Sequence, residues 1–415
     1  MTNAFTWVFL AALAAASATR IWLAARQVRH VRAHREEVPA TFAGAIPLAA
    51  HQKAADYTAA KGALGMVEVA IGAGIALWLT LGGLIQQLSD FWGGWFGTGS
   101  IAHGTALLLS IFILQAAAGL PVTLYRTFVV EERFGFNRMT LRLFVADLAK
   151  HALVGLALGV PLLLVVLWLM ERAGDRWWLY AWIVWVAYSL AMMMVYPALI
   201  LPLFNKFTPL AEGELRARVA ALLERTGFRS SGLFVMDGSR RSSHGNAFFT
   251  GFGAAKRIVL FDTLVERLQP PEVEAVLAHE LGHYKLHHIA KAMALTFGLS
   301  FAVLFALGEL IGRGWFYAGL GVATPTSAAG LALFFIVLPE LFFFLHPLTS
   351  LYSRKREYEA DAYATRHASA SDLVRALVKL YHDNAATLTP DPVHSAFYDS
   401  HPPAAMRIAR LKAAA

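Results

Sequence analysis

Two histidines and a glutamate stand close together at residues 278–283, whose sequence is AHELGH. Residues four apart share one face of a helix, so the imidazoles of His279 and His283 can converge on one metal ion. Glu280 is instead placed beside that ion, where it can take a proton from a bound water. Its neighbours are partly apolar, and burying an unpaired glutamate there would be costly. The pattern therefore favours a metal site over the alternative, a helix with ordinary surface His and Glu residues.

A third ligand must come from another part of the chain, and Glu357 is the best candidate. Two imidazoles, one carboxylate and an open position suit a single zinc ion. Asp361 lies four residues after Glu357 and would share its helical face, where it can accept a hydrogen bond from a ligand imidazole. Glu359 points elsewhere and is expected to be solvated or paired with arginine. A charged helix beside the membrane is the alternative for residues 354–361.

Two further histidines, His287 and His288, extend the histidine run. On a continuous helix His287 would lie about 12 Å from His279 along the axis, at 1.5 Å per residue. One ion cannot be shared over that distance. We therefore expect no metal-binding role for His287 or His288.

The elements that must position these residues belong to a membrane protein. The 415 residues include no cysteine, are 57% hydrophobic and only 15% charged, whereas soluble domains carry roughly 25% charged residues. A transmembrane helix needs about 20 mostly apolar residues. Seven segments qualify: residues 4–24, 65–87, 101–124, 152–171, 177–200, 292–312 and 329–350. The predicted fold class is an α-helical integral membrane protein.

Loop charge gives the orientation of these segments. The loops after the first and third segments are rich in Lys and Arg, while residues 88–100 hold neither. The positive-inside rule then places the amino terminus outside and both long polar segments, 201–291 and 351–415, in the cytosol. The net charge of +8 therefore reflects membrane topology, and no nucleic-acid partner is expected. Abundant Ala, with more Arg than Lys, is typical of a bacterial source, so the expected location is a bacterial inner membrane.

The chain is expected to divide into four parts. Residues 1–200 hold five transmembrane helices, 201–291 a metalloprotease domain, 292–350 two further transmembrane helices, and 351–415 a helical segment that supplies the third ligand. Within 201–291 the pattern predicts a helix at 210–226 and strands at 232–236, 245–249 and 257–261, which would form a small β-sheet. Pro270 begins the helix that carries the histidines, since proline suits the first helical turn.

In addition to this pattern, the chain resembles the CAAX prenyl protease 1 family, multispanning gluzincins that cleave prenylated peptides in eukaryotes. The resemblance covers nearly the whole chain, in order, and rests on these stretches: EERFGFN at 131–137, GNAF at 245–248, HELGH at 279–283, EYEAD at 357–361, and SHPP at 400–403 with Arg407. It implies seven helices around a large water-filled chamber into which the zinc site faces.

The resemblance also implies roles for single residues. It implies that His279, His283 and Glu357 bind the zinc, that Glu280 is the catalytic acid and base, and that Asp361 supports a ligand imidazole. It adds Asn246 on a strand that pairs with the substrate backbone, His401 near the scissile carbonyl, and Arg407 beside it. The residues alone would favour simpler explanations: a turn residue for Asn246 and a loop before two prolines for His401.

The predicted activity is zinc-dependent endopeptidase cleavage of membrane-associated or CAAX-type peptides, by a monomer in contact with membrane lipid. A site-2-type protease would carry its histidine motif inside a membrane span, and the heat-shock membrane gluzincin has fewer spans before the motif. The remaining alternative is a transporter or scaffold with a vestigial metal site, with which the intramembrane acids Glu68 and Glu340 are compatible.

Overall fold

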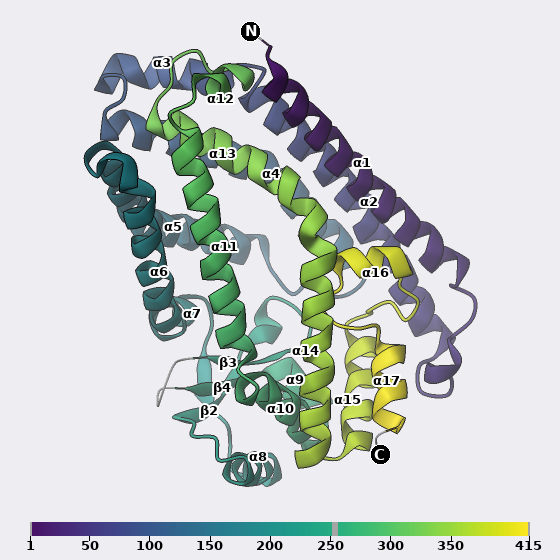
Figure 1. The fold of residues 1–415 in the computed structure, drawn as a ribbon. Helices are drawn as coiled ribbons and strands as arrows, with labels where there is room; N and C mark the ends of the chain where they lie inside the picture. The colour runs from purple at the N-terminus through teal and green to yellow at the C-terminus, as the bar shows by residue number, and fades with distance from the viewer. Residues whose placement is uncertain (1, 251–255, 414–415) are drawn as a thin grey trace.

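The computed structural model describes residues 2–250 and 256–413. Within them, seven helical stretches are long and apolar enough to cross a membrane: Ala4–Ala33, Leu48–Leu79, Ile101–Glu131, Leu141–Arg172, Gly174–Phe204, His288–Leu310 and Ser327–His367. The seven predicted membrane segments are thus confirmed. The amino terminus and the small β-sheet lie at opposite ends of the molecule, and the carboxyl terminus lies at the sheet end (Figure 1).

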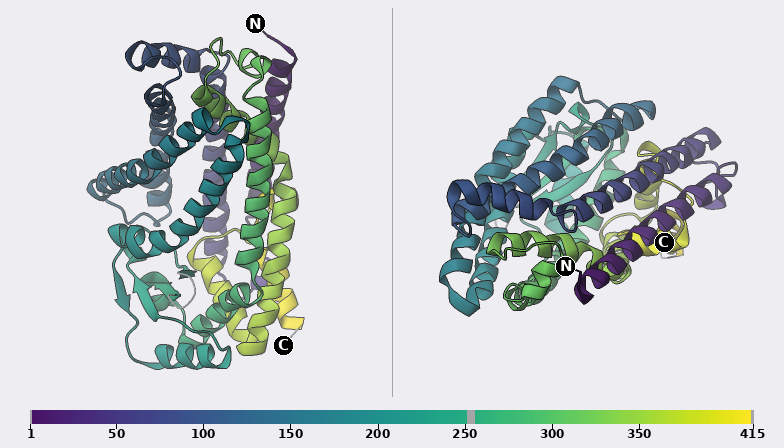
Figure 2. Two further views of the ribbon diagram at one scale, coloured as in Figure 1. Left: turned by 60° about the vertical axis from the view of Figure 1, so that its left-hand side comes forward. Right: turned by 90° about the horizontal axis from the view of Figure 1, so that it is seen from above.

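The first five of these stretches form one half of the membrane part. They are built from α1 (Ala4–Ala33), α2 (Leu48–Leu79), α4 (Ile101–Tyr125), α5 (Leu141–Arg172) and α6 (Trp177–Val195). α1 and α2 pack along each other. α4 continues into a wider, π-helical turn at Arg126–Glu131, and α6 continues through a similar turn at Tyr196–Ile200 into the short α7 (Leu201–Phe204). Figure 2 shows these long helices from the side and from above.

The predicted end of the second span is wrong. The helix ends at Leu79 rather than continuing to residue 87, and a separate helix, α3 (Leu84–Phe96), follows. Gly83 has a φ of 77° between them, a conformation that glycine adopts without steric cost. The side chain of Gln86 on α3 accepts hydrogen bonds from the backbone of Ala323 and Thr324, just after α12 (Gly314–Gly319), so these two short helices lie together near the amino terminus (Figure 1).

The four-stranded sheet has the order β1-β2-β4-β3. β1 (Phe207–Pro209) is antiparallel to β2 (Gly232–Met236), β2 is parallel to β4 (Arg257–Phe261), and β4 is antiparallel to β3 (Ala247–Thr250). β2 and β4 have the predicted bounds, whereas β3 begins at Ala247 instead of residue 245. Among the described residues β3 pairs with β4 alone, so one of its edges is unpaired.

Helices cover this sheet and form a core with it. They are α8 (Glu214–Arg225), α9 (Asp262–Arg267), α10 (Pro270–Lys285), α15 (Ala370–Asp383) and α17 (Ala404–Ala413), whereas α16 (Pro392–Tyr398) packs against α1 and α14 (His346–His367). Leu264, Leu277, Leu281 and Leu373 are buried together in this core. α10 begins at the predicted proline, and the side chain of Glu272 accepts a hydrogen bond from Gln269 to form a capping box.

The last two of the seven long helical stretches connect the membrane part to this core, and the second of them consists of two helices. α11 (His288–Leu310) leads into the membrane from α10, and α13 (Ser327–Phe342) leads back through a short turn to α14 (His346–His367). α14 packs against α10 (Figure 1). In the membrane part Glu340 pairs with Arg20 at 2.6 Å, and Glu68 pairs with Arg126, so both intramembrane acids are neutralised by an arginine.

Candidate active site

The predicted ligand atoms converge between α10 and α14. His279 Nε2 and His283 Nε2 lie 3.2 Å apart, and Glu357 places one oxygen 3.4 Å from the first and the other 3.2 Å from the second. One ligand atom from each of the three residues lies within 4.8 Å of the others. Two imidazoles and a carboxylate at this spacing form a donor set suited to zinc.

The environment of Glu357 supports a cation at this point. Glu357 is 4% exposed, and its Oε2 has no hydrogen-bond partner among the described residues. A buried charged oxygen without a donor is costly. A metal ion between the two Nε2 atoms would satisfy it, so the residues present fit the predicted group.

A glycine lets the two helices approach closely enough for this arrangement. A Cβ added at Gly282 would lie 3.0 Å from the Cα of Ala360 and 3.1 Å from the Cβ of Tyr363. Only a residue without a side chain fits against the α14 backbone at that distance. The glycine between the two histidines therefore brings Glu357 within reach of both imidazoles.

The outer nitrogen of His279 contacts a buried acid. Asp361 Oδ1 lies 2.9 Å from His279 Nδ1 and also accepts a hydrogen bond of 2.6 Å from Arg407, whose Nε donates to Oδ2 at 2.9 Å. Asp361 and Arg407 are 4% and 5% exposed. A proton on His279 Nδ1, held by Asp361, leaves the lone pair of Nε2 free for a metal.

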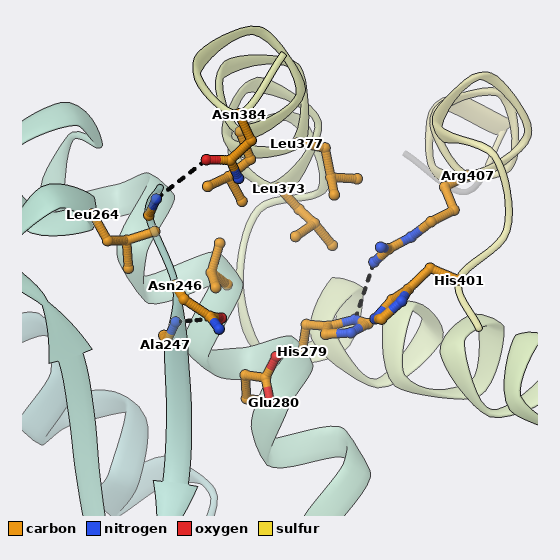
Figure 3. A pocket seen from close by; sticks show the side chains of 13 residues that line it. Asn246, Ala247, Leu264, His279, Glu280, Leu373, Leu377, Asn384, His401 and Arg407 are labelled. Atoms are coloured by element: carbon orange, nitrogen blue, oxygen red, sulfur yellow. Dashed lines mark hydrogen bonds between the residues drawn. The ribbon is translucent and has the colours of Figure 1, made fainter. Parts of the chain in front are cut away.

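Glu280 borders two cavities, one on each side. The first, of about 200 Å³, is lined by Asn246, Glu280, His401 and Arg407 together with leucines of α15. Figure 3 shows these side chains around one space, with Asn246 just before β3 facing Glu280 of α10. Burial raises the pKa of the Glu280 carboxyl, and the nearby imidazoles of His279 and His283 offset this rise only in part. A raised pKa suits a group that must take up and release a proton near neutral pH.

His401 approaches the ligand cluster from the loop before α17. Its Nε2 lies 3.4 Å from Glu357 Oε2, and its side chain is 59% exposed. Asn246 immediately precedes β3, and its backbone carbonyl accepts a hydrogen bond from the backbone of Phe261 in β4, on the paired side of the strand. All eight predicted site residues are therefore found within or beside one region.

Three residues at the site were not predicted from the sequence. Asn384 lines the first cavity and accepts a hydrogen bond from the backbone of Gly245. His288 and Glu359 form a contact of 3.0 Å, and His288 Nδ1 lies 3.1 Å from His283 Nδ1. The expectation that His288 and Glu359 are not metal ligands stays a prediction, but the contacts of His288 with Glu359 and with His283 were not expected. That expectation considered only a continuous helix past His283, whereas α10 ends at Lys285.

The second cavity has a volume of about 560 Å³ and lies between α6, β3 and α11. It is mostly apolar, and Glu280, His283 and His288 form part of its lining. Seven apolar helices joined to a buried His-His-Glu cluster, with a glutamate between two cavities, define the class of protein. It is a multi-pass membrane metalloendopeptidase.

Comparison with known proteins agrees with this class. Residues 27–206 match the model of the CAAX prenyl protease N-terminal region with five membrane helices, and residues 209–415 match peptidase family M48. The chain is 37% identical to the CAAX prenyl protease 1 homolog of Arabidopsis thaliana, covering 74% of this chain and 73% of that protein. It is 34% identical to the human homolog over 80% of each chain.

The fold has a close match among solved structures. The crystal structure of S. mikatae Ste24p superimposes with a TM-score of 0.91 over 99% of each chain, at 30% sequence identity. The chain belongs to the CAAX prenyl protease 1 family of membrane metallopeptidases. Family membership implies a metal and a peptide substrate.

Proposed function

We propose that this protein hydrolyses peptide bonds in membrane-associated or CAAX-type peptides, using one zinc ion held by His279, His283 and Glu357. The observation that carries the proposal is the convergence of these three side chains within 4.8 Å around an otherwise unsatisfied Glu357 oxygen. The names of the relatives, CAAX prenyl proteases, support the substrate class. Zinc bound here would activate a water and polarise the scissile carbonyl.

The protein's own residues would carry the remaining steps. Glu280 takes the proton of the attacking water and transfers it to the leaving amine. His401 donates a hydrogen bond toward the oxyanion as it forms. Asp361, itself held by Arg407, orients His279.

Substrate would bind along the free edge of β3. An extended peptide can add to an exposed strand through main-chain hydrogen bonds, and this edge begins next to Asn246 at the first cavity. Such binding would hold the scissile bond beside Glu280. The seven helices would enclose a hydrated chamber through which the substrate reaches this edge.

We place both polar segments, 201–291 and 351–415, on the cytosolic side of a bacterial inner membrane, in a monomer surrounded by lipid. Together they would form the catalytic part, between transmembrane parts 1–200 and 292–350. The basic loops support this orientation. Because the chain has no cysteine, single cysteines give clean labels. A membrane-impermeant thiol reagent added outside should label Thr98→Cys and leave Ser369→Cys unlabelled.

The central experiment compares Glu280→Ala with His279→Ala in purified protein. Zinc content is measured together with cleavage of a prenylated and an unprenylated CAAX peptide. Glu280→Ala should retain zinc and lose cleavage, whereas His279→Ala should lose both. Glu266→Ala, at an exposed position on α9, is the matched control and should behave as wild type.

Unchanged proteolysis in Glu280→Ala would reject the mechanism. Wild-type protein that binds zinc but cleaves neither peptide nor any membrane protein would instead favour the transporter or scaffold alternative. Comparing membrane proteomes with wild type and with Glu280→Ala would then identify natural substrates, because only the active enzyme depletes them.

A further inference from the structure

A sharp bend between α10 and α11 brings His288 back onto the metal cluster. His287 has a φ of 58°, a left-handed conformation that reverses the chain direction, and α11 begins at the next residue. His288 is therefore 2% exposed, and its Nδ1 lies 3.1 Å from His283 Nδ1. The ring centroids are 5.1 Å apart with an angle of 71° between the planes.

The proton positions along this contact follow from the ligand geometry. His283 Nε2 faces Glu357 and His279, so its lone pair is directed into the cluster. The proton of neutral His283 is then on Nδ1 and is donated to His288 Nδ1. His288 must in turn carry its own proton on Nε2. That nitrogen lies 3.0 Å from Glu359 Oε2, a carboxylate oxygen that accepts it.

His283, His288 and Glu359 thus form a series of two hydrogen bonds in which each N–H donor has an acceptor and the last acceptor is a carboxylate. The other histidine ligand, His279, is held by a carboxylate without an imidazole in between, since its Nδ1 contacts Asp361 directly. The backbone carbonyl of His288 is also held, by a hydrogen bond of 3.2 Å from Arg356 on α14. α14 thus supplies Glu357 to the cluster and Glu359 to the imidazole behind it.

We propose that His288 and Glu359 are positioning residues for the metal ligand His283. Through His288, Glu359 fixes the tautomer and orientation of His283 and makes it a better ligand. The inference rests on the proposed zinc site. Removing such outer partners typically weakens metal affinity by about 10- to 100-fold.

The experiment measures the zinc dissociation constant of full-length protein in detergent, by competition with a chromophoric chelator. His288→Leu should bind zinc about 10- to 100-fold more weakly than wild type. His288→Asn retains an oxygen acceptor near the Nδ1 position and should recover much of this loss. His287→Asn, at the exposed residue with the left-handed backbone, is the control and should match wild type.

A second comparison tests whether Glu359 acts through His288. Glu359→Leu should weaken zinc binding in the wild-type background and have little further effect in His288→Leu, because the two residues belong to one series. Glu359→Gln retains an acceptor and should lie between wild type and Glu359→Leu.

Three outcomes would overturn the inference: His288→Leu binding zinc within twofold of wild type, His287→Asn binding as weakly as His288→Leu, or additive losses in the double variant. These outcomes differ from failure of the proposed function, in which wild-type protein itself binds no zinc. Thermal unfolding of the metal-free variants shows whether each folds. If His288→Leu does not fold, the Glu359→Leu and His288→Asn values decide the question.

Discussion

Arg407 and Asp361 form a two-point ion pair in the interior, with hydrogen bonds of 2.9 and 2.6 Å. The pair joins α17 to α14 directly behind His279. Because both groups are almost completely buried, neither charge can be compensated by solvent. The final helix of the chain is thereby connected to the orientation of a predicted metal ligand.

Replacing Arg407 should affect both stability and metal binding. Arg407→Ala leaves Asp361 as a buried unpaired charge and should lower the free energy of unfolding by about 3–5 kcal/mol. Arg407→Lys keeps the charge but cannot form both hydrogen bonds in the same geometry, so we expect an intermediate loss. Thermal unfolding and zinc titration measure the two effects. Arg410→Ala, at an exposed position on the same helix, is the control.

Gly282→Ala should weaken zinc binding without altering any polar group. The added methyl would lie 3.0 Å from the Cα of Ala360, so α10 and α14 must separate and Glu357 must withdraw from the imidazoles. We expect at least a tenfold larger zinc dissociation constant. Gly298→Ala, on α11 with no atom within 4 Å of the new methyl, should leave zinc binding unchanged. Equal affinity in both variants would contradict the role given to the helix contact.

His401→Ala should reduce turnover while leaving the metal in place. The side chain is largely exposed and contacts only the edge of the cluster, so stability and zinc content should change little. Loss of one hydrogen-bond donor to an oxyanion costs about 10²- to 10³-fold in kcat. Steady-state kinetics with a CAAX peptide test this. A variant with wild-type kcat would remove His401 from the mechanism.

Asp391 should make stability depend on acid pH. Burial opposes its ionisation, but hydrogen bonds from Arg26 and from the backbone of His394 outweigh this and hold the pKa of the carboxyl below its usual value. Its contribution is therefore present above the unfolded-state pKa of about 3.9 and is lost as pH falls through the lower folded-state pKa.

Asp391→Asn keeps an acceptor at the start of α16 and removes the charge. At pH 7 we expect its Tm to lie below that of wild type by about 2–4 °C for each kcal/mol lost. The difference should shrink as pH falls below about 4, because the carboxyl of the unfolded wild-type chain then takes up a proton. It should vanish only once pH lies below the lower folded-state pKa, where the folded carboxyl is also neutral. A difference independent of pH would show that the ion pair with Arg26 adds no stability.

The helix and strand boundaries that depend on neighbouring residues could be predicted from the sequence, and so could the ligand spacing on α14. Pro270 begins α10, and short continuous apolar runs give β2 and β4 their bounds. The spacing of Glu357 and Asp361 places both on the face of α14 toward the histidines. Each depends on residues a few positions apart. The second span was extended too far because its hydropathy continues across the turn at Gly83.

The missed residues depend on contacts that the sequence does not display. A left-handed backbone at His287 is uncommon for a residue other than glycine, so the bend that returns His288 to His283 has no clear signal. Glu359 was assigned from its spacing to Glu357 alone, without the partner that this bend supplies. Asn384 reaches Gly245 across 139 positions of the chain.

The free edge of β3 has a consequence for which proteins can be cut. Backbone groups of a helical segment are already bonded to one another, so such a segment cannot add to the strand until it unwinds. We therefore expect susceptibility to follow the local unfolding free energy of a target segment as much as its side chains. Tails and partly unravelled helices would be degraded, while intact membrane helices of similar sequence would survive.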